Sequence, residues 1–353
     1  MIKLKKNNAQ RETEFMAKIL EVNDLITRFY TFDGVVHALS GVSFDLDEGE
    51  TLGIVGESGS GKSVTMMSLL HLLPTPPARI EGGKALFYSN RNEQNNNTDP
   101  VDLLQLDKSG IRKIRGGKIG FIFQDALSAL NPVMTIGRQI SETLIEHLGM
   151  TVDEAKKRSI ELLEYVGIPE AEKRFSAYPH QFSGGMRQRT MIAVAIACNP
   201  EIIIADEPTT ALDVTVQAQI IELVQRLKKE MKMSVIWITH DLGVVAGMAD
   251  RVLVMYAGSA VEIAPVDDLF YNPGHPYTIK LLGALPKIGE EGQHRLESID
   301  GTPPDLLSPP AHCQFAWRCP HAAEKCWQAV PAAREISPGH HAACFFDFAA
   351  RRP

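Results

Sequence analysis

The sequence predicts an α/β fold in which buried strands end in polar, reactive loops. A glycine-rich loop at residues 56–63 (GESGSGKS) lies between an apolar run at 51–55 (TLGIV) and a helical run at 63–73, which a proline ends. Two more apolar runs, 201–205 (EIIIA) and 235–239 (VIWIT), have the length and composition of buried strands. Strands of this kind that alternate with helices are typical of a parallel sheet.

The glycine-rich loop fits the pattern G-x-x-x-x-G-K-[ST], which binds phosphates. Its glycines let the backbone approach a polyphosphate, and the following helix directs its N–H groups and positive end at the same point. Lys62 can reach the β and γ phosphates, and the Ser63 hydroxyl can hold Mg²⁺. The alternative is a glycine-rich turn without a ligand, but the lysine, hydroxyl, strand and helix together favour a nucleotide. The expected contacts are Gly56, Glu57, Ser58, Gly59, Ser60, Gly61, Lys62, Ser63 and Val64.

Composition limits the possible functions. The 353 residues allow one large domain or two modest ones, and the net charge of -7 argues against a general nucleic-acid-binding protein. No apolar run is long enough to span a bilayer. Residues 1–16 are polar and basic and are not followed by an apolar segment, so we expect a flexible arm rather than a signal peptide, with Met16 as an alternative start to Met1. These features and the nucleotide site predict a cytoplasmic protein.

Short strand-like runs fill residues 18–46 and predict a small antiparallel sheet ahead of the phosphate loop. Phe29 or Tyr30 could stack on adenine there, although a core aromatic would look the same in the sequence. Asn-rich residues 89–102 predict a solvated loop. A further strand at 118–123 ends at Gln124, and residues 131–167 have a helical pattern with charged, solvated faces.

Residues 182–189 (FSGGMRQR) precede an apolar helix at 190–198. A Ser-Gly-Gly at a helix start can bind an anion by the same physics as the first loop, and the alternative is a helix cap alone. Asp206 and Glu207 follow the strand at 201–205, and His240 follows the strand at 235–239. Ligands bind at that edge of an open α/β sheet, so one carboxylate can support a metal and the other a water.

In this order, the motifs of residues 19–265 resemble the nucleotide-binding subunit of an ATP-binding cassette (ABC) transporter. The phosphate loop, Gln124, the Ser-Gly-Gly signature, IIIADEP at 202–208, Ala-Leu-Asp at 211–213 and His240 all match. The signature departs at Phe182 and Met186 from the commoner LSGGQ, with its glycines intact. The resemblance implies a P-loop NTPase (RecA-like) core, with an N-terminal antiparallel β-subdomain and an α-helical subdomain inserted at about residues 127–192.

The same resemblance assigns the catalytic roles. Glu207 polarises the attacking water as general base, and His240 holds the γ-phosphate. Gln124 contacts the metal and the water and senses the membrane partner. Asp206 and Ser63 bind Mg²⁺. Phe29 is the expected adenine-stacking aromatic, with Tyr30 as the alternative.

A second copy of the cassette is also implied. The signature residues Ser183, Gly184 and Gly185 close on ATP bound to the other subunit, and Asp213 lies at the contact between the two. A signature and a phosphate loop separated by a helical subdomain face different ATP molecules. A chain with one of each therefore completes a site only by pairing head to tail.

Residues 266–353 form a predicted C-terminal extension of the domain at 17–265. The segments HPYT at 275–278 and LLGALP at 281–286 resemble the tail of the oligopeptide/dipeptide importer subfamily. The extension holds four of the five cysteines, Cys313, Cys319, Cys326 and Cys344, whereas Cys198 lies in an apolar helix and is expected in the core.

The spacings of these four cysteines, x5, x6 and x17, favour metal binding over disulfides in a cytosolic protein. The spacings alone choose neither zinc nor an iron–sulfur cluster, and four free or disulfide-forming thiols are the alternative. The subfamily resemblance favours a [4Fe-4S] cluster over Zn²⁺.

The leading hypothesis is an ATPase that uses ATP and Mg²⁺ to drive import of di- or oligopeptides. It implies a second, related ATPase subunit, two transmembrane permease subunits and, indirectly, an extracytoplasmic solute-binding protein, with the chain peripheral on the cytoplasmic membrane face. Nickel or sugar is the alternative cargo. A soluble ABC ATPase acting on DNA or ribosomes is disfavoured because no coiled-coil insertion, second cassette or basic surface is visible. Intact Lys62, Glu207 and His240 disfavour a degenerate partner that only binds ATP.

Overall fold

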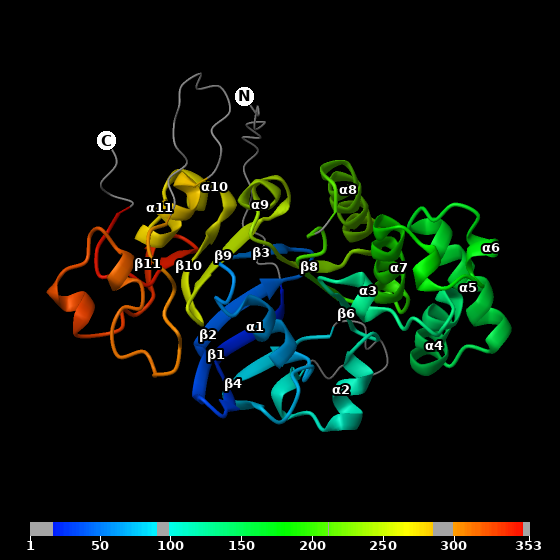
Figure 1. The fold of residues 1–353 in the computed structure, drawn as a ribbon, viewed down its shortest axis with the longest axis horizontal. Coiled ribbons are helices and arrows are strands. Elements are labelled where there is room, and N and C mark those ends of the chain that lie inside the picture. The colour runs from blue at the N-terminus through cyan, green and yellow to red at the C-terminus, as the bar shows by residue number, and fades with distance from the viewer. Residues whose placement is uncertain (1–16, 90–98, 211, 285–298, 349–353) are drawn as a thin grey trace, which may run out of the picture.

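The computed structural model describes residues 17–89, 99–210, 212–284 and 299–348. Two sheets and a group of helices make up the fold (Figure 1). The predicted arm at 1–16 lies outside the described residues. No helix in the described ranges has both the length and the apolarity needed to cross a membrane.

The first sheet is antiparallel and has the strand order β2-β1-β4-β5. Its strands are β1 (Lys18–Thr31), β2 (Gly34–Asp47), β4 (Ala78–Phe87) and β5 (Val101–Asp102). The turn between β1 and β2 falls at Asp33-Gly34, where glycine adopts a positive φ of 133°. The antiparallel sheet predicted before the phosphate loop is present.

The second sheet has the order β11-β12-β10-β9-β3-β8-β7-β6. Its strands are β3 (Thr51–Val55), β6 (Ile119–Ile122), β7 (Ile202–Asp206), β8 (Ser234–Ile238), β9 (Arg251–Tyr256), β10 (Ser259–Pro265), β11 (Arg334–Ser337) and β12 (His340–Ala342). The neighbouring strands β9, β3, β8, β7 and β6 pair in parallel. Of these, β3, β7 and β8 are buried along their whole length. A strand covered on both faces has no need of polar alternation, which explains the all-apolar runs in the sequence.

Helices cover the two faces of this sheet differently (Figure 1). One face packs on α1 (Lys62–Leu69) and the antiparallel sheet. The other packs on helices that follow the parallel strands, namely α7 (Gly184–Ile196), α8 (Val214–Met231), α9 (Leu242–Met248), α10 (Val266–Tyr271) and α11 (Pro276–Gly283). Ile203 and Ile204 of β7 point to opposite faces and enter different core clusters, as the two-residue period of a strand requires.

A group of helices lies between β6 and β7 in sequence and extends to one side of the sheets (Figure 1). They are α3 (Ala126–Ala129), α4 (Ile136–Leu148), α5 (Val152–Tyr165), α6 (Ala171–Arg174), η2 (Pro179–Gln181) and α7, while α2 (Lys108–Ile114) and η1 (Leu103–Gln105) precede β6. This arrangement confirms the inserted helical region of the predicted fold class. The boundaries at 127 and 192 stay a prediction.

Three predicted elements differ from the structure. The helix expected at 63–73 is α1 and ends at Leu69, because His71 adopts a left-handed φ of 50°. The helical run expected at 131–167 divides into α4 and α5 at Gly149, whose φ is 64°, and Thr151 then caps α5 with a capping box. The helix expected at 190–198 begins earlier, because Ser183 caps it ahead of the two glycines.

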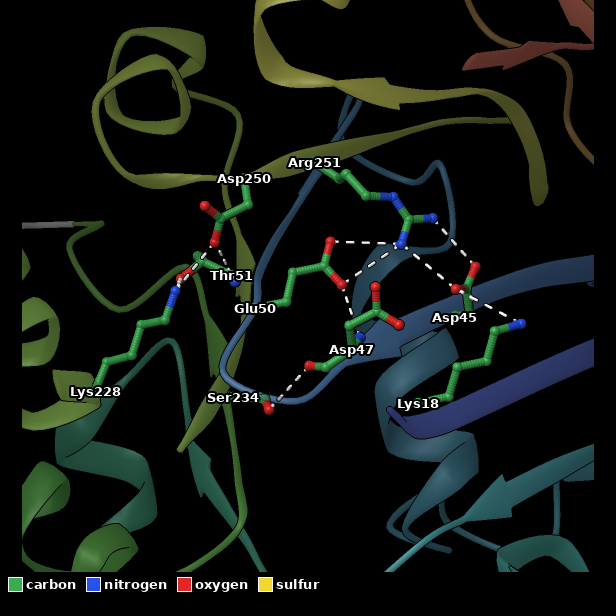
Figure 2. A network of polar contacts seen from close by, with 9 residues as sticks. All are labelled: Lys18, Asp45, Asp47, Glu50, Thr51, Lys228, Ser234, Asp250 and Arg251. Atoms are coloured by element: carbon green, nitrogen blue, oxygen red, sulfur yellow. Dashed lines mark hydrogen bonds and ion pairs between the residues drawn. The ribbon is translucent and has the colours of Figure 1, made fainter. Parts of the chain in front are cut away.

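A polar network joins the antiparallel sheet to the end of the second sheet at which the parallel strands β3, β8 and β9 begin (Figure 2). Arg251, at the start of β9, contacts Asp45 of β2 at 3.1 Å and Glu50 at 3.5 Å. Glu50 also accepts a hydrogen bond from the Asp47 N–H at 2.8 Å. These contacts fix the turn that leads into β3.

The same network continues along the neighbouring strands (Figure 2). Asp250 accepts hydrogen bonds from the Thr51 N–H at 2.9 Å and from Lys228 Nζ at 3.1 Å. The Ser234 hydroxyl, at the start of β8, donates to the Asp47 carbonyl at 3.1 Å. The first residues of β3, β8 and β9 are therefore tied together at one end of the sheet.

The C-terminal extension is fastened to β10. The β11–β12 hairpin adds to that strand, and buried Glu262 accepts hydrogen bonds from His340 Nε2 at 2.7 Å and from the Gly274 N–H at 2.6 Å. Between α11 and β11 lie two short helices, η3 (Ala316–Arg318) and η4 (Glu324–Trp327). The extension thus belongs to the same core as the sheet.

We predict that Glu50→Gln makes the free energy of unfolding less dependent on pH. Burial raises the pKa of Glu50 from 4.5 to about 7, so the folded state holds the proton more tightly than the unfolded state. The stabilising effect is fully present below pH 4.5 and is lost as pH rises through 7. Wild-type stability should therefore fall relative to the variant by about 2 kcal/mol between pH 5 and pH 8, measured by urea unfolding.

Glu146→Gln is the matched control, because this exposed carboxylate pairs with Arg112 at the surface. We expect it to change stability by less than about 0.5 kcal/mol across the same range. Parallel curves for wild type and Glu50→Gln would contradict the assignment.

Candidate functional site

The phosphate loop turns sharply between β3 and α1. Gly56 has a φ of 152°, and a Cβ there would lie 2.2 Å from the Met255 carbonyl oxygen. Gly61 has a φ of 102°, and a Cβ there would lie 2.9 Å from the Leu39 side chain. Only glycine fits at both positions, so the loop can pass close to β9 and β2 before it enters the helix.

Lys62, the first residue of α1, folds back over this loop. Its Nζ donates hydrogen bonds to the carbonyl oxygens of Gly56 at 2.8 Å and Glu57 at 3.0 Å. Burial lowers the pKa of the amine, while Glu207 and Asp206 act to raise it. The ammonium therefore lies inside the loop and next to both carboxylates, as a phosphate-binding lysine must.

Ser63 and Asp206 come together from α1 and the end of β7. The Ser63 hydroxyl donates to Asp206 Oδ1 at 2.9 Å. Burial raises the pKa of Asp206, and the hydrogen bond from Ser63 lowers it. Two adjacent hard oxygens of this kind suit Mg²⁺.

Glu207 directly follows β7 and contacts residues that follow β6 and β8. Its Oε2 lies 3.2 Å from Gln124 Nε2, after β6, and 3.4 Å from His240 Nδ1, after β8. It also accepts a hydrogen bond from Thr210 at 2.9 Å, and its backbone is left-handed with a φ of 45°. Three candidate catalytic residues from separate parts of the sequence are therefore within contact distance.

Most of these groups line one cavity of about 580 Å³, whereas Asp206 is not part of its lining and contacts it through Ser63. Its lining consists of Phe29, Val36, Ala38, Ser58, Gly59, Gly61, Lys62, Ser63, Val64, Gln124, Glu207, His240 and Leu306. The predicted residues Gly56, Glu57 and Ser60 lie in the loop behind this lining. Val36, Ala38 and Leu306 were missed, because no local pattern marks an apolar residue that reaches the site through tertiary packing.

The structure separates the two candidate aromatics. Phe29 lines the cavity, whereas Tyr30 lies with its ring 4.8 Å from the Arg79 guanidinium and its hydroxyl on Glu81. Phe29 is therefore the aromatic in position to contact a bound base.

The signature residues lie outside the cavity. The Ser183 side chain caps α7 through the Met186 N–H at 3.3 Å, and Ser183 and Gly184 are exposed. Gly185 packs so closely on Val216 that a Cβ would lie 2.9 Å from it. Asp213 is likewise exposed and caps α8. Their predicted contact with a second subunit stays a prediction.

The four cysteines of the extension line one small cavity together with His275, Phe315 and His321. All five cysteines of the chain are free thiols. Burial raises the pKa of Cys313 and Cys344, and raises that of Cys319 to about 11. Within the described residues, no group of three or more His, Cys, Asp or Glu side chains could hold a metal ion as placed, so a metal centre is not demonstrated.

Cys198 lies apart from this group. It is buried two residues after α7 ends, and burial raises its pKa to about 11. The core position expected from the sequence is confirmed, whereas the expected place within a helix is wrong, because the helix ends at Ile196.

Comparison with known proteins gives two family matches. The ABC transporter family matches residues 39–210, and the C-terminal region of oligopeptide/dipeptide transporters matches residues 261–326. Among solved structures, a dimeric ATP-binding cassette, MJ0796, in a post-hydrolysis state bound to ADP and Pi, has a TM-score of 0.60 and 29% identity. That match covers 70% of this chain and 99% of the other.

Curated relatives match over nearly the whole chain. The oligopeptide transport ATP-binding protein OppD of Bacillus subtilis is 50% identical over 92% of this chain and 88% of its own length. OppD of Salmonella typhimurium is 51% identical over 93% of each. The dipeptide transport ATP-binding protein DppD of Bacillus subtilis is 50% identical over 94% of this chain and 95% of its own length. The chain therefore belongs to the ATP-binding subunits of ABC transporters, within the oligopeptide/dipeptide transporter subfamily.

Proposed function

We propose that this chain is the ATP-hydrolysing subunit that energises import of di- or oligopeptides through a membrane ABC transporter. The observation that carries the proposal is the convergence of Lys62, Ser63 and the Glu207 cluster on one cavity, with Asp206 hydrogen-bonded to Ser63. The relatives named for oligopeptide and dipeptide transport support the choice of cargo. Nickel or sugar remains the alternative cargo.

The residues of the site have separable roles in this proposal. The loop N–H groups and Lys62 bind the phosphates of ATP. Ser63, Asp206 and Gln124 hold Mg²⁺, which offsets the charge on the β and γ phosphates when it is bound. Glu207 takes the proton of the attacking water, and His240 contacts the γ-phosphate.

The neighbours of Glu207 prepare it for this role. Thr210 and Gln124 donate hydrogen bonds to Glu207 Oε2. His240 Nδ1 lies 3.4 Å from the same oxygen. Several contacts to one oxygen fix the orientation of the carboxylate. The other oxygen then remains available to a water molecule.

A second ATPase subunit completes the site in this proposal. Ser183 and Gly184 are exposed and outside the cavity, which leaves them accessible to ATP bound by a partner and supports this part of the proposal. The similar cassette MJ0796 is dimeric, which supports pairing of this chain with a second cassette. We propose a related but different chain as the partner.

We propose further that two permease subunits hold this chain at the cytoplasmic membrane face, with an extracytoplasmic solute-binding protein as an indirect partner. A groove of about 480 Å³ between α4 and α5 supports a docking site for short permease helices. Ile145 and Phe175 line it, and Val152 there is 73% exposed. Charged Arg138 and Lys156 flank these apolar side chains, which suits an amphipathic helix.

For the extension we propose a [4Fe-4S] cluster held by Cys313, Cys319, Cys326 and Cys344, with Zn²⁺ as the alternative. Four cysteines that share one cavity supply the complete ligand set of such a cluster. Binding would convert these thiols to thiolates, offsetting the unfavourable burial that raises the pKa of Cys319. A structural staple for the proline-rich extension is the simplest purpose.

We predict that Glu207→Gln binds ATP with near wild-type affinity but hydrolyses it at least about 100-fold more slowly, because the amide cannot accept the proton of the water. The reconstituted transporter allows turnover and nucleotide binding to be measured on the same sample. The variant should also accumulate as a closed dimer with ATP. Equal, negligible turnover of both proteins with the permeases present would instead favour a subunit that only binds ATP.

We predict that Val152→Asp abolishes peptide uptake by the transporter, while the subunit paired with its partner ATPase subunit, without the permeases, keeps its ATPase rate within about twofold. A charge in the groove opposes docking of an apolar helix face. Val330→Asp is the control, since this exposed valine lies in the extension and away from α5. Loss of uptake in both variants, or in neither, would argue against this docking site.

We predict that anaerobically purified protein is brown, absorbs near 400 nm and contains acid-labile sulfide. Cys319→Ser should lose this absorbance, because it removes one of four ligands. Cys198→Ala should keep it, because that thiol lies in the core of another region. A colourless, zinc-loaded anaerobic preparation would refute the cluster.

A further inference from the structure

The C-terminal extension contacts the phosphate loop directly. Arg318, the last residue of η3, donates from Nη1 to Glu57 Oε2 at 2.6 Å and from Nη2 to Glu57 Oε1 at 2.9 Å. Two parallel bonds between a guanidinium and a carboxylate form the strongest and most directional type of ion pair in proteins. The partners are far apart in sequence, so only the fold brings them together.

The surroundings hold the guanidinium rigidly. The Arg318 side chain is only 4% exposed, and that of Glu57 is 25% exposed. Arg318 also donates to the carbonyl oxygens of Asp300 at 2.9 Å and Ile299 at 3.1 Å, and to the Tyr256 hydroxyl at 3.3 Å. The arginine is therefore set in place by the extension and β9 and does not depend on Glu57 for its position.

Glu57 is part of the loop that binds phosphate. Its carbonyl oxygen accepts a hydrogen bond from Lys62 Nζ at 3.0 Å, and its N–H donates to the Tyr277 hydroxyl at 2.8 Å. Its carboxylate pairs with Arg318, and the neighbouring loop residues Ser58 and Gly59 line the cavity. A carboxylate so close to a triphosphate would repel it unless a cation neutralised the charge.

We propose that Arg318 is a positioning residue for ATP binding. It neutralises Glu57 and holds the carboxylate away from the phosphates, so that the C-terminal extension sets the affinity of the phosphate loop for charged nucleotides. The proposal rests on the proposed ATP site and adds to it a residue outside the sequence motifs of the nucleotide-binding domain.

A second contact brings the same part of the extension to the other end of the cavity. Leu306 lines the cavity, as Phe29 does, and its carbonyl oxygen accepts a hydrogen bond from the His37 N–H at 2.8 Å. Residues 299–318 therefore contact both the phosphate loop and the end of the cavity where Phe29 lies. An extension that served only as a peripheral attachment would have no need to reach either place.

The test compares Arg318→Met with the double variant Arg318→Met/Glu57→Gln in the full-length chain. Calorimetric titration with a non-hydrolysable ATP analogue, ADP and adenosine gives the dissociation constants. We expect Arg318→Met to weaken binding of the ATP analogue about fivefold, to weaken ADP less, and to leave adenosine unchanged, because repulsion grows with ligand charge. The double variant should recover most of the loss, since the repelling carboxylate is gone.

Arg334→Met is the matched control. Arg334 lies in the same extension and bonds the carbonyl oxygens of Cys344 at 3.0 Å and Phe346 at 2.5 Å, without touching the phosphate loop. The Arg334→Met variant should lower the unfolding temperature without changing the dissociation constant of any of the three ligands. Arg318→Lys keeps the charge but loses the paired bonds, and should lose less than twofold. If the methionine variant does not fold, Arg318→Gln removes the same charge with a polar side chain and serves as the test, with the same expected losses as Arg318→Met.

Some outcomes would overturn the proposal. Equal weakening of all three ligands would show that Arg318 only stabilises the fold, and so would a double variant as weak as Arg318→Met. Unchanged affinity in the methionine variant would show that the charge of Glu57 does not reach the nucleotide. Failure of wild type to bind the ATP analogue would instead refute the proposed function itself.

Discussion

The ATP site depends on one constraint: β7, β8 and β3 are neighbouring parallel strands buried on both faces. Such strands can carry functional groups only where they end, because a polar side chain within them would meet an apolar core. Their carboxyl ends meet at one edge of the sheet. The phosphate loop, Asp206, Glu207 and His240 are therefore brought together by strand pairing, and their chemistry follows from that proximity.

At the opposite end of the same strands, ion pairs and hydrogen bonds connect the sheet to its neighbouring elements. Arg251, Glu50 and Asp45 connect the antiparallel sheet to β9, and Lys228 connects α8 to the start of β3 (Figure 2). Burial raises the pKa of Glu50 to about 7, so this network is less favourable when the carboxylate is ionised than a surface ion pair would be. A geometrically specific network at one end of these strands thus accompanies the candidate catalytic groups at the other.

Sequence patterns predicted the parts of the site that are local. A loop pattern marks Lys62 and Ser63, and the end of an apolar run marks Asp206 and Glu207, because one strand or one turn creates each signal. Leu306 carries no such signal, since its role arises where a distant segment crosses β2. Helix ends were missed for a related reason: a left-handed residue such as His71 ends α1 although the apolar pattern continues. The Arg318–Glu57 pair was beyond sequence reasoning, because Glu57 is marked only as part of the phosphate loop and nothing in the sequence connects it with Arg318.

The C-terminal extension is attached to the nucleotide-binding core at two places. It is fastened to β10 through buried Glu262 and His340, and it reaches the phosphate loop through Arg318. Cys319 follows Arg318 directly and lines the cavity that the four cysteines share. The cysteine cavity and the phosphate loop are therefore connected through one peptide bond, between Arg318 and Cys319, and one ion pair, between Arg318 and Glu57.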